Sequence, residues 1–143
     1  MHSAFMLPIA HGPELPAQAR TVEAIYAAAH WLLTRGRPLD AARVFRVQLR
    51  VAPRDERGWL GLGECHERAD QLLIAAELYG AGSVLAGPQG RVSIRCLLAR
   101  ARVLAQLGRA ADVQAMLDAA ERAAEEAESD LLELVRMERR RLI

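Results

Sequence analysis

One stretch decides the fold of this chain: Trp59-Leu60-Gly61-Leu62-Gly63-Glu64-Cys65-His66. Its marked residues, Trp59, Leu62, Gly63 and His66, follow one another at i, i+3, i+4 and i+7, which places them on one face of an α-helix. No segment of the 143 residues shows the sustained period-two alternation of a half-buried strand. The stretch therefore predicts a helix in an all-helical protein.

The same spacing opens the tetratricopeptide pattern, W-x2-L-G-x2-Y, followed by a small residue, an aromatic residue and a proline over about 34 residues. His66 takes the tyrosine position, and Ala75 and Tyr79 follow at the expected offsets. A preceding unit carries Ala29, Gly36, Ala41, Phe45 and Pro53, and a following, weaker unit carries Leu97, Ala101, Leu104, Gly108 and Leu117. The turn residues Gly36 and Asp70 lie 34 residues apart (70 − 36), whereas Gly108 lies 38 beyond Asp70 (108 − 70), which predicts a longer loop at 87–90.

Glycine and proline positions divide the chain into helices of similar length. We expect seven, at about 18–35, 38–51, 55–69, 71–85, 92–107, 110–127 and 131–142. Residues 1–17 are rich in proline, which predicts a flexible N-terminal arm ahead of a tetratricopeptide-repeat domain at 18–143. Within that domain we expect units at about 22–54, 55–88 and 92–127, with a cap at about 130–142.

The pattern implies an all-α fold, a right-handed superhelix of three helix pairs plus a C-terminal capping helix. Small residues at Ala29, Gly63 and Ala101 let the two helices of a pair approach closely. Phe45 and Tyr79 are expected to fill the space between successive pairs. Trp59 is expected in the core for the same reason.

The composition excludes several classes of function. The net charge is +1, from 19 basic and 18 acidic residues, so there is no electrostatic footprint for nucleic acid or an anionic membrane. Cys65 and Cys96 are expected to be reduced thiols, because a chain with its own core needs no disulfide framework. No residue pattern predicts a catalytic site, a metal site or a cofactor. The N-terminus lacks the basic segment and cleavage site of a signal peptide.

The segments 25–29, 41–45 and 59–65 together resemble the bacterial type III secretion chaperones of the translocator class (class II). That family has three tetratricopeptide units and an L-G-L-G-x-C run at this place in the second unit. The similarity spans roughly 22–120. It implies a cytoplasmic virulence chaperone that binds a hydrophobic translocator protein and keeps it soluble before export.

The resemblance also implies that an extended client segment lies in a concave groove lined by the first helix of each pair. Repeat geometry places the candidate client-binding residues there, with no metal among them: Tyr26, His30, Leu33, Leu60, Glu64, Glu67, Leu98 and Arg102. A purely structural interpretation of Tyr26 and Leu33 is that they pack against the N-terminal arm.

A second hypothesis is a tetratricopeptide adaptor or scaffold for a different protein partner, including another secretion component. An enzyme has no support in the sequence. Because the N-terminal segment is short and broken by proline, we expect a monomer or a weak homodimer. From the balanced charge we expect no nucleic-acid partner, and we expect no stable membrane insertion.

Overall fold

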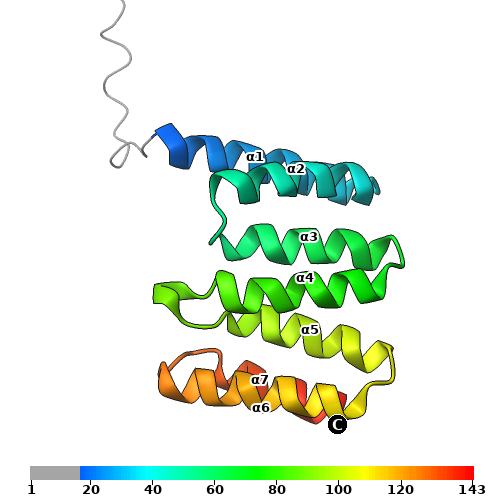
Figure 1. Ribbon diagram of the computed structural model, residues 1–143, viewed down its shortest axis with the longest axis vertical. Helices are drawn as coiled ribbons and strands as arrows, with labels where there is room; N and C mark the ends of the chain where they lie inside the picture. The colour runs from blue at the N-terminus through cyan, green and yellow to red at the C-terminus, as the bar shows by residue number, and fades with distance from the viewer. Residues whose placement is uncertain (1–16) are drawn as a thin grey trace, which may run out of the picture.

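The computed structural model describes residues 17–143, so the expected N-terminal arm lies outside the described residues except for Ala17. The elements are α1 (Ala17–Thr34), α2 (Pro38–Val51), α3 (Glu56–Arg68), α4 (Leu72–Leu85), the 3-10 turn η2 (Pro88–Gly90), α5 (Ile94–Gln106), α6 (Ala110–Glu126) and α7 (Leu132–Leu142). The helices stack along one long axis, from α1 and α2 at one end to α6 and α7 at the other (Figure 1). The all-α fold is confirmed for the described part of the chain, and each expected helix end lies within two residues of the observed one.

Three equivalent turns connect the two helices of each pair. Gly36, Asp70 and Gly108 have positive φ angles of 75°, 59° and 73°, the left-handed conformation that ends many helices. After each of them, the next backbone amide donates to a carbonyl oxygen five residues earlier, at 2.8–3.0 Å. The three turn residues expected from the sequence therefore share one geometry, and aspartate is among the few side chains that tolerate it.

Small residues stand where helices cross, as expected. A methyl group on Gly63 would lie 2.2 Å from the ring of Tyr79, and one on Gly61 would lie 2.3 Å from the ring of Phe45. The equivalent alanines are fully buried: Ala29, Ala41, Ala75 and Ala101. Phe45 of α2 thus fills the space beside α3, the first helix of the next pair.

Two buried clusters make the core. One joins α1, α2 and α3 around Phe45, Leu62 and Cys65. The other joins α4, α5, α6 and α7 around Tyr79, Leu117 and Val135. Because each cluster is shared between helix pairs, no pair in the described chain buries its apolar side chains alone.

The expectation for Trp59 is corrected. Its side chain is half-buried: the ring lies against Gly82, and the indole nitrogen donates to the carbonyl oxygen of Pro53 at 2.9 Å, close to solvent. Trp59 therefore lies at the edge of the core, where its polar nitrogen reaches the turn between α2 and α3.

The cap is α7, which packs on α6 and α5. Its residue Val135 is fully buried. Its residue Arg139 pairs with Asp118 and Glu121 of α6 at 2.8 and 3.2 Å. Arg136, Arg140 and Arg141 are exposed on its outer side. None of the helices described combines the length and apolar character needed to cross a bilayer.

Candidate functional site

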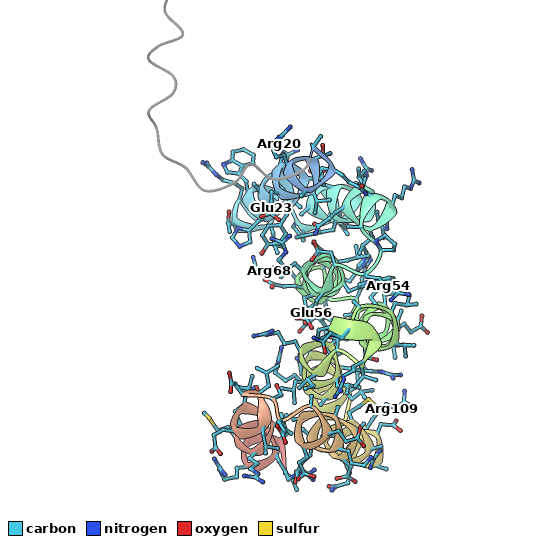
Figure 2. All side chains as sticks on the ribbon, turned by 90° about the vertical axis from the view of Figure 1, so that its left-hand side faces the viewer. Arg20, Glu23, Arg54, Glu56, Arg68 and Arg109 are labelled. Atoms are coloured by element: carbon cyan, nitrogen blue, oxygen red, sulfur yellow. The ribbon has the colours of Figure 1, made fainter. Side chains whose placement is uncertain are left out.

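The odd-numbered helices form a continuous row. Successive members, α1 with α3, α3 with α5 and α5 with α7, touch one another, whereas the corresponding contacts between even-numbered helices are weaker or missing in the described chain. Such an imbalance curves a stack toward its more closely spaced row. We call the surface of the odd-numbered helices that faces away from α2, α4 and α6 the inner face; it carries Glu23, Tyr26, His30, Arg57, Leu60, Glu64, Glu67, Arg68, Arg102 and Glu138. Glu23 and Arg68 point to this side in Figure 2.

Two residues provide the apolar part of the inner face. Tyr26 is half-buried, with its ring centroid 6.2 Å from that of Phe45 and 5.9 Å from that of His30. Leu60 is also half-buried and packs against the cluster of α4 to α7. His30 is exposed beside them. The three side chains leave part of their surface open to a partner.

The charged candidates on the inner face are held in pairs. Glu64 pairs with Arg68 at 2.6 Å, and Arg68 also donates to the carbonyl oxygen of Leu33 at 3.1 Å, which ties α3 to α1. Arg102 of α5 pairs with Glu138 of α7 at 3.5 Å. Glu67 accepts a hydrogen bond from the hydroxyl of Tyr79. Burial and this contact with Glu67 raise the pKa of Tyr79, so its hydroxyl stays protonated and continues to hold the carboxylate.

Two expected groove residues do not reach the surface, and the expectation for them is corrected. Leu33 is 3% exposed, because α2 folds back over the last turn of α1 and encloses it beside Ala41. Leu98 is 1% exposed and shares the buried cluster of Val135 on α7, which packs against α5. The inner face consists of the other six candidates and their charged neighbours.

One cation of this face, Arg57 in the first turn of α3, was not identified from the sequence. Arg57 donates to Glu23 of α1 at 3.1 Å and to Asp55 at 2.9 Å, and its guanidinium lies 4.5 Å from the centroid of the Tyr26 ring. A signal was present, since Glu23, Arg57 and Arg95 repeat with the same intervals as the turns, 34 (57 − 23) and 38 (95 − 57) residues.

Electrostatics at this network favour the charged forms. The hydrogen bonds of Glu23 and then Asp55 raise the pKa of Arg57, and the hydrogen bond of Arg57 lowers the pKa of Glu23. Burial of Asp55 works toward a higher pKa, but its hydrogen bonds with Arg57 outweigh that and leave the pKa lowered. The charged network therefore links α1 to α3 beside the ring of Tyr26.

The described residues offer few other reactive or metal-binding groups. Cys65 and Cys96 are free and buried, and burial raises the pKa of each thiol to about 11. Within 17–143, no group of three or more His, Cys, Asp or Glu side chains is placed to hold a metal ion. The inner face is suited to contact a polypeptide, because it combines partly open apolar side chains with paired charges.

Comparison with solved structures shows that the fold is similar to that of known chaperones. The type III secretion translocator chaperone SycD of Yersinia enterocolitica is 26% identical, with a TM-score of 0.73, over 87% of this chain and 89% of SycD. The chain is a structural relative of the type III secretion translocator chaperones. No family model matches the sequence, and no curated protein matches it either.

Two further translocator-chaperone structures extend the comparison. SycD in complex with a peptide of the translocator YopD is 26% identical, with a TM-score of 0.63, over 84% of this chain and 95% of that one. PcrH from Pseudomonas aeruginosa is 21% identical, with a TM-score of 0.70, over 94% of this chain and 98% of that one, and this likeness concerns the fold. The resemblance inferred from the sequence is confirmed.

Proposed function

We propose that this chain is a cytoplasmic chaperone that binds a hydrophobic type III secretion translocator and keeps it soluble before export. The observation that carries the proposal is the likeness to SycD, a translocator chaperone also known in complex with a translocator peptide. The match covers 87% of this chain and 89% of SycD, so it includes most of the helical stack. The role requires binding alone, and we propose no catalytic step.

In this proposal an extended client segment lies along the inner face. Its apolar side chains contact Tyr26 and Leu60, the half-buried residues of α1 and α3. The exposed His30 and the half-buried Arg102 lie beside it and can bond to the client backbone, which would otherwise lose its hydrogen bonds to water. Covering apolar client surface in this way removes the cause of its aggregation.

The test is co-expression with the translocator of the chain's own secretion system. We expect the translocator to move from the insoluble to the soluble fraction and to purify with the chain. Two controls are expression without the chain and expression of an unrelated aggregation-prone protein with it. A translocator that stays insoluble in the presence of the folded chain would reject the proposal. The comparisons give no support to the alternative, an adaptor for a different kind of partner.

A further inference from the structure

A cleft of about 850 Å³ lies at one edge of the stack, where the connections between helices meet. Its walls come from the α2–α3 turn, the α4–α5 loop and the end of α6 with the start of α7. These connections share one edge of the molecule in Figure 1, and Figure 2 faces that edge, with Arg54 and Glu56 labelled. The volume is within the range of ordinary ligand-binding clefts.

The cleft owes one wall to the extra residues between the second and third units. A methyl group on Gly87 would lie 1.5 Å from the carbonyl oxygen of Arg91, so the loop is closed tightly on itself. The amide of Ser93 donates to the carbonyl oxygen of Ser83 at 2.8 Å, and its hydroxyl donates to Glu56 at 2.7 Å. The loop is therefore fastened to both α4 and α3.

The base of the cleft is apolar. Ala86 and Ile94 are 3% and 8% exposed beneath it, and Ala123 and Leu131 are half-buried on the opposite wall. Val92 is 39% exposed and lies at the rim. An apolar side chain of a partner can enter here and displace water from these groups.

The available charge at the rim is mainly positive. Asp55 is already bonded to Arg57, and Glu56 accepts from Ser93 and pairs with Arg95 at 3.4 Å. Among residues 17–143, Arg54 and Arg91 have no ion-pair partner, and both are exposed. Glu126 is the one lining carboxylate without an ion pair in that same range.

We infer that this edge cleft binds a second, acidic segment of the client, in which an apolar side chain is flanked by carboxylates. The inference rests on the proposed function and adds a second contact to it. The apolar side chain lies over Ile94 and Ala86, and the carboxylates pair with Arg54 and Arg91. The chain's own residues 1–16 are a poorer match, because Glu14 is the single acidic residue among them.

Two labelled peptides test the inference. The probes are fluorescein-labelled SDLDDLDS and its neutral counterpart SNLNNLNS, and fluorescence anisotropy gives the Kd of each. We expect the acidic peptide to bind at least about tenfold more tightly than the neutral one, and to weaken at higher ionic strength. The variant Arg54→Glu/Arg91→Glu should lose at least about tenfold in affinity for the acidic peptide. The charge-matched variant Arg43→Glu/Arg109→Glu should keep it.

Leu60→Asp separates this inference from the proposed function. It alters the inner face, so it should impair solubilisation of the translocator and leave binding of the acidic peptide unchanged. Equal affinities for the two peptides, or no binding up to about 1 mM, would overturn the edge-cleft inference. The inference would also be overturned if folded Leu60→Asp lost binding of the acidic peptide while Arg54→Glu/Arg91→Glu kept it. Failure of solubilisation by the unmodified chain would instead reject the proposed function.

Discussion

Single positions in this chain are constrained by what the neighbouring helix places against them. Gly61 and Gly63 each face an aromatic ring that leaves no space for a methyl group. Gly80 differs: a methyl group there would meet the guanidinium of Arg100 at 3.1 Å, the movable end of a long side chain. The same residue type is thus required for packing at one position and dispensable at another.

This contrast predicts opposite effects of the same substitution. Gly63→Ala should lower the free energy of unfolding by about 1–3 kcal/mol, because the ring of Tyr79 must shift within a packed core. Gly80→Ala should leave stability unchanged or raise it, by up to about 1 kcal/mol, because alanine favours a helix interior. Urea unfolding followed by circular dichroism measures both. A Gly63→Ala protein as stable as the parent would show that the crossing at Gly63 is looser than described.

The buried thiols predict a loss of stability in alkali. Each has its pKa raised from 9.0 to about 11, so the unfolded chain releases these protons at lower pH than the folded chain does. Their contribution is therefore complete below pH 9 and is lost as the pH rises to about 11. Cys65→Ala/Cys96→Ala should show a smaller fall in melting temperature between those two values. An equal fall in parent and variant would contradict the assignment.

Between elements, the sequence predicted the helices and turns well because their signals are local. Gly36, Asp70 and Gly108 end helices through their own backbone preferences, and the repeat interval alone relates them. Leu33 and Leu98 were wrongly placed because their burial depends on α2 and α7, which pack on them from elsewhere in the chain. Helical periodicity gives the face of a residue but not what covers it.

The junction between α1 and α3 depends on Arg57, which bonds Glu23 and covers the ring of Tyr26. Arg57→Ala should therefore increase amide hydrogen exchange in α1 more than in α5, whereas Arg43→Ala on α2 should change neither. The lowered pKa values of Glu23 and Asp55 mean that their stabilising contribution is present at neutral pH and is lost as the pH falls through those values, below 4.5 and 3.8. The exchange rates of α1 in the parent and in Arg57→Ala should therefore become more alike in acid. If the amides of α1 exchanged at the same rates in the parent and in Arg57→Ala at neutral pH, that result would argue against this junction.

For the whole molecule, a monomer or weak dimer stays a prediction. The exposed large apolar side chains on the even-numbered helices lie on α2 and at both ends of α4: Leu39, Val47, Leu73, Ile74, Val84 and Leu85. Exposed apolar residues in such small groups are common on monomers and do not by themselves make a stable interface. Light scattering across a concentration series should give a mass that stays near that of one chain and rises only at high concentration. A constant dimer mass at low micromolar concentration would contradict this.

Binding of the client on the inner face is tested most directly by co-expression of the translocator with two matched variants. His30→Asp/Leu60→Asp places two carboxylates on the inner face, where an apolar client segment would have to desolvate them. Val47→Asp/Leu73→Asp makes the same charge change at exposed positions of α2 and α4, 46% and 60% exposed.

Circular dichroism first establishes that both variants are folded at the temperature of the assay, because Leu60 is half-buried and its replacement costs some stability. The measurement is then the fraction of translocator in the soluble supernatant. The inner-face variant should leave the translocator insoluble, and the outer variant should solubilise it as well as the parent does. A folded inner-face variant that still solubilises the translocator, while the outer variant fails, would place the client on the opposite side of the molecule.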